Sequence, residues 1–198
     1  MDAKAFIYDS LDKLKKLGFD ATAQKEEIAA WSVDMPEEIV EAMEPEQILG
    51  MSLSMVGNLF RTESGPAELY TFDVEVMDVS EMYTTFLKSI ACLSHGELVI
   101  TDIEEVFSTE VFEAGEGIQP VSFTCNGTAY RYEAKVHNDW FDTGILTFME
   151  KVIKEQNTGS HLYVTSDGYQ ECIVFYRTKE WAQQFYDLFH MELECPCD

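Results

Sequence analysis

The sequence predicts an α+β fold in which a helical N-terminal third packs on a mostly antiparallel sheet that contains two tandem ββα units. Three observations support this prediction: apolar residues at helical spacing over the first sixty residues, and two hairpin turn dipeptides, each followed by an amphipathic helix. The polar turn Glu63-Ser64-Gly65-Pro66 separates the two parts. We therefore expect a helical region over residues 1–62 and an α+β region over residues 66–198.

The helical region begins with an apolar stripe that ends at Gly18, a common helix stop. Pro36 and Pro45 each stand near the first position of a further helix, where proline is well tolerated. Gly50 and Gly57 lie within the last of these helices and allow close contact with other helices. The stripe of the first helix consists of Ile7, Leu11, Leu14 and Leu17.

The middle third mixes strand and helix patterns. Residues 70–76 alternate between apolar and polar, which predicts a half-exposed strand. Asp78 and Glu81 form a candidate capping box for a helix that carries Met82 and Phe86, and a further strand is expected over residues 98–103. The periodicity of residues 104–117 fits either a strand pair or a short helix.

The first hairpin turns at Asn126-Gly127, the dipeptide that best accepts positive φ at both central positions of a two-residue turn. This turn fixes the register, and side chains alternate between faces along each strand. We expect one face to be core and the other to be solvent or partner. The facing pairs on the core side are Cys125 with Thr128, Phe123 with Tyr130, and Val121 with Tyr132; the other face carries Ser122, Thr124, Arg131, Glu133 and Lys135.

The second hairpin is expected over residues 161–176, around the turn dipeptide Asp167-Gly168. Its return strand, residues 172–176, is apolar without alternation, which is typical of a strand covered on both faces. The helical region is a candidate for that second cover.

Each hairpin is followed by a helix with apolar residues at helical spacing. Asp142 and Thr178 are suited to accept hydrogen bonds from the amides of the first turns. Gly159 marks the end of the first helix and Pro196 follows the second. The apolar residues are Ile145, Phe148, Met149, Val152 and Ile153 in the first helix and Trp181, Phe185, Leu188 and Phe189 in the second.

Composition limits the partners of the chain. Its 198 residues and 46% hydrophobic content suffice for a proper core, and 37 acids against 13 bases give a net charge of −24. Such a charge repels nucleic acid phosphates and anionic membrane surfaces, so we expect neither to bind. No stretch approaches the roughly 20 apolar residues of a membrane span. The N-terminus does not resemble a signal peptide, and we expect a cytosolic protein.

The charge is concentrated in the middle of the chain, where residues 63–120 carry 13 acids and 1 base. A surface of this kind accelerates association with a basic protein and selects for it, whereas the alternative is an ordinary solvated acidic surface. The spacing of the acids does not match a calcium-binding EF-hand loop. We call the predicted partner-binding residues the acidic block: Asp102, Glu104, Glu105, Glu110, Glu113 and Glu116.

Five cysteines form no C-x-x-C pair. Cys125 and Cys172 fall in predicted strands, where a thiol usually acts as a small buried hydrophobe. Cys195-Pro196-Cys197 could bind a soft metal or form a redox pair, but the sequence shows no further ligands beside it. We expect no metal and no cofactor.

Two groups of residues resemble acid–base machinery. His137 and Asp139 lie within a segment between a strand and a helix, where Asn and Asp also favour turns and caps. Asp167 and Glu171 pair across the second turn, but Asp167 belongs to the turn itself, and a satisfied hairpin is the better explanation of both. No catalytic residue is therefore assigned, and a hydrolase or transferase that uses His137 and Asp139 is kept as an alternative.

Three segments of the last seventy residues carry a resemblance to known proteins: Asp139-Trp140-Phe141-Asp142, Tyr163-Val164-Thr165-Ser166-Asp167-Gly168-Tyr169-Gln170 and Phe175-Tyr176-Arg177-Thr178-Lys179-Glu180-Trp181. With these segments the chain resembles a set of small cytosolic bacterial proteins, some of which are similar to immunity proteins that neutralise polymorphic toxins. This resemblance implies a non-enzymatic protein-binding module, and a phage-related accessory structural protein is a further alternative.

Overall fold

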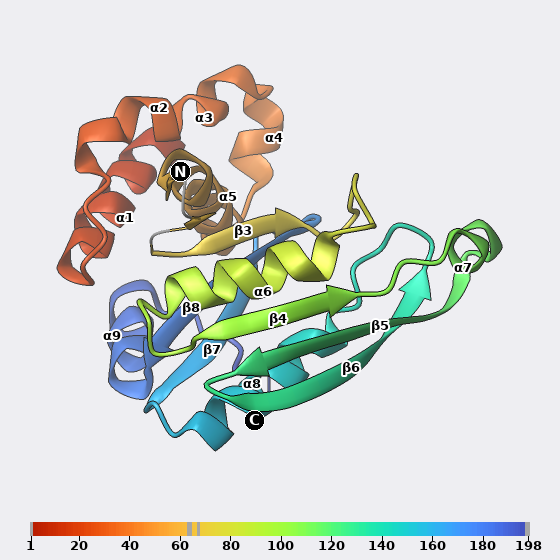
Figure 1. The fold of residues 1–198 in the computed structure, drawn as a ribbon. Coiled ribbons are helices and arrows are strands. Elements are labelled where there is room, and N and C mark those ends of the chain that lie inside the picture. The colour runs from red at the N-terminus through yellow and green to blue at the C-terminus, as the bar shows by residue number, and fades with distance from the viewer. Residues whose placement is uncertain (1, 63–64, 67, 197–198) are drawn as a thin grey trace.

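The computed structural model describes residues 2–62, 65–66 and 68–196 and has the predicted α+β fold (Figure 1). Glu63 and Ser64 of the predicted boundary turn, and Cys197, lie outside the described residues. The helices are α1 (Ala3–Lys16), the 3-10 helix η1 (Thr22–Gln24), α2 (Lys25–Ala29), α3 (Trp31–Asp34), α4 (Glu37–Ala42), α5 (Pro45–Leu59), α6 (Met82–Leu93), α7 (Thr109–Ala114), α8 (Gly144–Gln156) and α9 (Lys179–Phe189). The strands are β1 (Arg61–Thr62), β2 (Gly65–Pro66), β3 (Tyr70–Asp73), β4 (Ile100–Glu105), β5 (Glu116–Cys125), β6 (Thr128–His137), β7 (Ser160–Ser166) and β8 (Glu171–Thr178).

The two predicted ββα units are present as β5-β6-α8 and β7-β8-α9, and all strand pairs are antiparallel. The two hairpins lie in two sheets rather than in one, with strand orders β4-β5-β6 and β3-β8-β7. The reason is that each hairpin pairs with a different earlier strand, β4 beside β5 and β3 beside β8. The short β1-β2 ladder stands apart from both.

Sheet β3-β8-β7 separates two hydrophobic cores. One face packs with α6, α8 and the inner face of sheet β4-β5-β6, and the other packs with the N-terminal helices and α9. Val174 of β8 is buried in the first core, whereas its neighbours Ile173 and Phe175 are buried in the second. The expectation that β8 is covered on both faces, with the helical region as part of the cover, is confirmed. Figure 1 shows the N-terminal helices and hairpin β5-β6 on opposite sides of this sheet.

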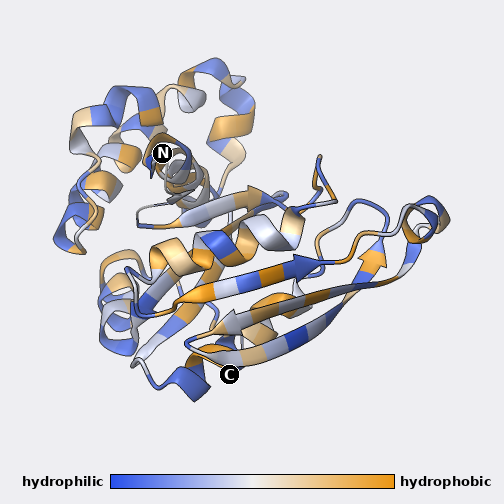
Figure 2. Ribbon diagram, in the orientation of Figure 1, coloured by the Kyte–Doolittle hydropathy of each residue, from blue (hydrophilic) through white to orange (hydrophobic). Residues whose placement is uncertain are grey.

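The first hairpin has the register that its Asn-Gly turn predicts, with Cys125 facing Thr128 and Phe123 facing Tyr130. Asn126 and Gly127 both have positive φ, at 48° and 84°. The core side of β5 is buried, and the opposite side is at least partly exposed. The neighbouring strand β4 does not alternate regularly: its two apolar residues, Ile100 and Ile103, are three positions apart, and its pairing with β5 shifts register between Thr101 and Glu104 (Figure 2).

The second hairpin does not have the predicted two-residue turn. Ser166 pairs with Cys172, and four residues lie between the strands. The carboxylate of Asp167 accepts hydrogen bonds from the amides of Tyr169 (2.8 Å) and Glu171 (3.2 Å). These bonds stabilise a wider turn. In a two-residue turn these amides would belong to the paired strands, whereas here the buried Asp side chain accepts their hydrogen bonds.

Several helix ends follow the predicted signals and two do not. Helix α8 ends at Gln156 with Asn157, rather than Gly159, as its left-handed cap. Thr178 caps α9 by accepting from the Trp181 amide, and Asp142 accepts from the Gly144 amide at the start of α8. The predicted capping box of Asp78 and Glu81 is absent: Asp78 accepts from Ser80, and Glu81, at the N-cap position, makes no capping bond. The first turn of α6 is instead bonded by a carboxylate from β4, which no local pattern reveals.

The two glycines of α5 allow close contact with strands rather than with helices. A Cβ at Gly57 would lie 2.5 Å from Cγ2 of Thr71, and one at Gly50 would collide with the carbonyl oxygen of Ser166. Thr71 is consequently buried, as is Tyr70 on the opposite face. The strand predicted as half-exposed is therefore covered on both faces at its first two residues.

Candidate functional site

The acidic block lies along β4, the short helix α7 and the start of β5. Asp102 has a φ of +52° at an irregularity in the β4-β5 pairing, and Glu104 faces outward across from Ser122. Residues 104–117, for which the sequence left two possibilities, form the end of β4, the helix α7 and the start of β5. Figure 1 shows α7 at the far end of hairpin β5-β6, away from the N-terminal helices.

Helix α7 is short because both of its ends are fixed by local signals. The Ser108 side chain accepts from the Val111 amide, and Gly115 ends the helix with a left-handed φ of 72°. Phe112 stacks on Phe107 with 4.8 Å between ring centroids, which holds the helix on the chain before it. The acids Glu110 and Glu113 are left exposed.

Glu105 differs from the other five members of the acidic block, which are all exposed. Its carboxylate accepts hydrogen bonds from the amides of Tyr83 (3.3 Å) and Thr84 (2.7 Å) at the start of α6, and from Nε2 of Gln119 (2.7 Å). Burial raises the pKa of Glu105, although the amide hydrogen bonds oppose this effect. Glu105 therefore joins β4 to α6 and is not available to a partner in the way that its neighbours are.

An open cleft of about 1020 Å³ lies beside α7 and is lined by Phe112. We call it the acidic cleft, because five carboxylates line it against one guanidinium, that of Arg61. Its apolar lining includes Met77, whose side chain is fully exposed, and Phe141. The five acids are Asp73, Glu75, Asp78, Asp139 and Glu171.

Glu171 is the least exposed acid of the acidic cleft and lies at the start of β8. Burial is the main cause that raises the pKa of Glu171, with Asp167 and Asp73 adding to it. A cationic group placed in the cleft would lower the free-energy cost of keeping this partly desolvated carboxylate ionised. The cleft thus has the electrostatics of a binding site for positive charge.

Among the described residues, no hydrogen bond or ion pair joins the side chains of the acid–base candidates His137 and Asp139. Both side chains are exposed, His137 at the end of β6 and Asp139 in the turn that follows. Their backbone carbonyls accept from the amides of Trp140 (3.1 Å) and Val76 (2.8 Å), which gives the segment a structural role. Asp139 lines the acidic cleft, whereas His137 is not among its lining residues.

Cys125 and Cys172 are buried in strands, as expected for thiols that act as small hydrophobes. Burial raises the pKa of the Cys172 thiol to about 12. A nucleophilic cysteine requires the opposite shift, because the thiolate is the reactive form. These two residues are part of the core.

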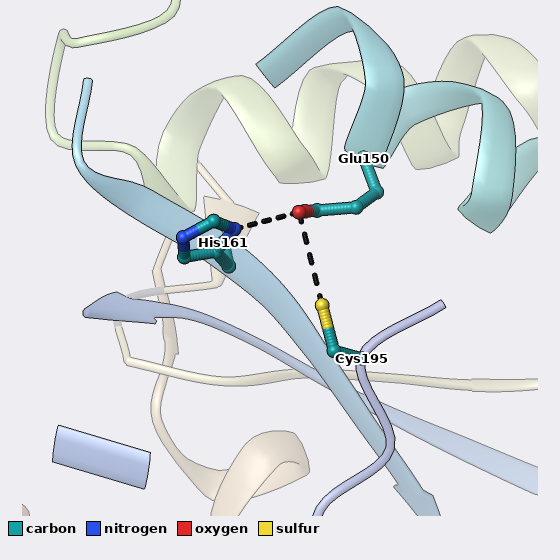
Figure 3. Close-up of side chains that lie close together, drawn as sticks. All are labelled: Glu150, His161 and Cys195. Atoms are coloured by element: carbon teal, nitrogen blue, oxygen red, sulfur yellow. Dashed lines mark hydrogen bonds and ion pairs between the residues drawn. The ribbon is translucent and has the colours of Figure 1, made fainter. Parts of the chain in front are cut away.

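A second cluster joins Glu150 of α8, His161 of β7 and Cys195 of the C-terminal segment (Figure 3). One carboxylate oxygen of Glu150, Oε1, lies 2.7 Å from Nδ1 of His161 and 3.7 Å from Sγ of Cys195. The other, Oε2, accepts from the Leu162 amide at 2.9 Å. The carboxylate of Glu150 is fully buried and occupies the free edge of β7.

The cluster is not a thiol–imidazole catalytic pair. In such a pair the histidine lies between the thiol, whose proton it takes, and the carboxylate that orients it. Here the carboxylate lies between the other two groups (Figure 3). His161 therefore faces Glu150 with Nδ1, and the thiol of Cys195 donates to the Glu150 carboxylate.

Sequence reasoning found only one member of this cluster, Cys195, through its C-x-C motif. Glu150 and His161 lie 45 and 34 residues before it and are brought to it by α8 and β7. One signal was available, because Glu150 falls on the apolar face of its helix, between Leu146 and Ile153. A carboxylate in that position requires a buried partner.

Among the residues that the structure describes, no helix combines the length and the apolar character needed to cross a bilayer. Comparison of the chain with protein families, curated proteins and solved structures finds no match.

Proposed function

We propose that this chain is a non-enzymatic module that binds a basic protein partner, in the manner of a toxin-neutralising immunity protein. The acidic cleft carries the proposal, because five carboxylates and one guanidinium line a cleft of about 1020 Å³. The exposed members of the acidic block lie on β4, α7 and the start of β5, and Phe112 of α7 lines the cleft.

Both long-range and short-range interactions support this binding mode. Negative charge concentrated at one cleft attracts a basic partner and speeds its association. Apolar side chains exposed among the acids supply surface that water leaves on binding, which contributes affinity. These side chains are Met77 in the acidic cleft and Val106, Phe107 and Ile118 beside α7.

A toxin that acts on nucleic acid is the kind of partner that fits this surface. The substrate site of such a toxin is basic, and an acidic surface can occupy it without catalytic residues of its own. The net charge of −24 disfavours binding of this chain to nucleic acid, so we expect it to act on the toxin and not on the toxin's substrate.

The test reverses three exposed acids that line the acidic cleft, Glu75→Lys, Asp78→Lys and Asp139→Lys, in one variant. Its matched control is Glu37→Lys, Glu38→Lys and Glu41→Lys, which changes the net charge equally on exposed residues of α4. The probe is a fluorescein-labelled peptide in which lysine and tyrosine alternate, and its association rate is measured by stopped flow.

At low salt we expect the first variant to associate about tenfold more slowly than the natural chain, and the control less than about twofold more slowly. The difference should shrink at high salt, because salt screens exposed charges. Equal slowing in both variants would mean that only the net charge matters and would refute a site at this cleft.

A further inference from the structure

We propose that Glu150, His161 and Cys195 form a binding site for a borderline-soft divalent cation, for which Zn²⁺ is the best fit. The site would join the C-terminal segment to α8 and to the free edge of β7. It is separate from the acidic cleft and does not depend on the proposed function.

The donor set selects the class of metal. A carboxylate oxygen, an imidazole nitrogen and a thiolate sulfur are the three ligand types that Zn²⁺ accepts in proteins. Mg²⁺ and Ca²⁺ prefer oxygen ligands alone, and a thiolate disfavours both. One ligand atom from each of the three residues lies within 4.8 Å of the other two.

Two of the three distances between ligand atoms, Oε1–Sγ and Oε1–Nδ1, require little movement to admit the ion. Tetrahedral Zn²⁺ with ordinary bond lengths separates an oxygen from a sulfur ligand by about 3.5 Å and from a nitrogen ligand by about 3.3 Å. The Oε1–Sγ distance is already 3.7 Å. The Oε1–Nδ1 distance of 2.7 Å has to open by only about 0.6 Å to reach the separation that the metal needs.

The backbone on both sides of Cys195 is held in place without a metal. Glu194 exchanges two hydrogen bonds with Val164 of β7, at 2.8 and 3.0 Å. On the other side, the hydroxyl of Thr147 in α8 donates to the carbonyl of Pro196 at 3.0 Å. The thiol is thus directed at Glu150 from a fixed position, and ligands fixed in advance lower the entropic cost of binding.

Glu150 gives the site its energetic rationale. Its fully buried carboxylate is bonded by the His161 imidazole and the Leu162 amide, while the Lys154 ammonium stands 3.7 Å away. A buried carboxylate is costly unless it is well paired, and a divalent cation is the strongest available partner. Metal binding would replace the weak 3.7 Å thiol contact with a bond between the metal and a thiolate.

The site has a route to solvent. Cys195 also lines an open depression of about 760 Å³ between β7, α9 and the C-terminal segment. Tyr163, Tyr186 and Glu194 line the same depression. A cation can enter there, and a water molecule can complete the fourth position of the tetrahedron.

The first test measures Zn²⁺ affinity of the full chain by competition with a chromophoric chelator. We expect one ion per chain, with affinity lowered at least about tenfold by Cys195→Ser or His161→Gln. Matched controls are Cys92→Ser, a thiol outside the cluster, and His137→Gln, an exposed imidazole; both should bind as the natural chain does. Equal affinity in Cys195→Ser and Cys92→Ser would overturn the proposal, as would failure of the natural chain to compete for Zn²⁺.

The second test identifies the sulfur ligand by loading the chain with Co²⁺. We expect the thiolate-to-cobalt charge-transfer band in the natural chain and in Cys92→Ser, and its loss in Cys195→Ser. Cys197 lies outside the described residues, so the same spectrum is recorded for Cys197→Ser, which should keep the band. A band that survives Cys195→Ser and disappears in Cys197→Ser would refute the assignment.

Discussion

The two hairpins of this protein have similar lengths but different surroundings. In β5 only alternate residues are buried, such as Phe123, and those between them are partly exposed. In β8 the adjacent residues Ile173 and Val174 are both fully buried, because the N-terminal helices and α9 cover one face and α6 and α8 the other. The comparison teaches that the hydrophobic pattern of a strand reports how many of its faces are covered, and not which sheet it joins.

The strongest way to test this comparison is to place the same polar residue in each hairpin. Ile173→Asn should lower the free energy of unfolding by about 4 kcal/mol or more, because it removes a buried side chain and introduces an amide among apolar neighbours. Thr124→Asn, on the outer face of β5, should cost less than about 1 kcal/mol. Urea unfolding monitored by circular dichroism gives both values.

A similar loss in both variants would contradict the comparison. It would mean that the outer face of β5 is covered in solution, for instance by a second copy of the chain. Sedimentation of the natural chain would then show an oligomer.

A smaller effect is expected at the turns. Gly127 and Gly168 have the same φ of 84°, but a Cβ at Gly127 meets no atom within 4 Å, whereas one at Gly168 lies 3.3 Å from Gln47. Gly127→Ala should therefore lower the free energy of unfolding only by the cost of a left-handed backbone at a residue with a Cβ, about 1–2 kcal/mol. Gly168→Ala should cost at least as much, because Gln47 of α5 must also move.

Thermal unfolding of the two variants, with Gly127→Asn as a third, checks this order. Asn tolerates positive φ better than Ala, so Gly127→Asn should recover part of the loss. A Gly127→Ala variant as stable as the natural chain would show that the turn does not fix the register of the first hairpin.

Local patterns predicted the elements of the fold better than their connections. The Asn126-Gly127 turn and the Thr178 cap act through neighbouring backbone atoms, and both are found as predicted. The second turn is different because the buried Asp167 side chain bonds two amides beyond it. Similarly, the start of α6 is bonded by Glu105 from β4, 22 residues beyond Tyr83 in the sequence.

The candidate sites follow the same rule. The acidic block could be predicted because the density of acidic residues is read directly from the sequence. The hydrogen bonds between Glu105 and α6 could not be predicted in this way. The cluster at Cys195 depends on α8 and β7 meeting the C-terminal segment, and its members are widely separated in sequence. The spacing of residues in the sequence does not predict tertiary contacts between distant residues, and both sites depend on such contacts.

The smallest expected effect is a dependence of stability on pH. The sheet of each hairpin contributes one half-buried carboxyl to it, Glu105 in β4 and Glu171 in β8. Burial raises the pKa of both above the ordinary value of 4.5. The folded chain therefore binds more protons than the unfolded chain between pH 4.5 and the raised value. The stabilisation is complete below this window and is lost as the pH rises through it. Urea unfolding at pH 7.5 and pH 5.5 should show higher stability at the lower pH.

The net charge of −24 also falls on acidification, and reduced self-repulsion acts in the same direction. The variant Glu171→Gln separates the two causes, because it removes the buried carboxyl and leaves the other acids to titrate. We expect its gain in stability between the two pH values to be smaller than that of the natural chain. The matched variant Glu113→Gln, at an exposed position of α7, should keep the full gain. Identical gains in both variants would show that burial of Glu171 contributes nothing to the pH dependence.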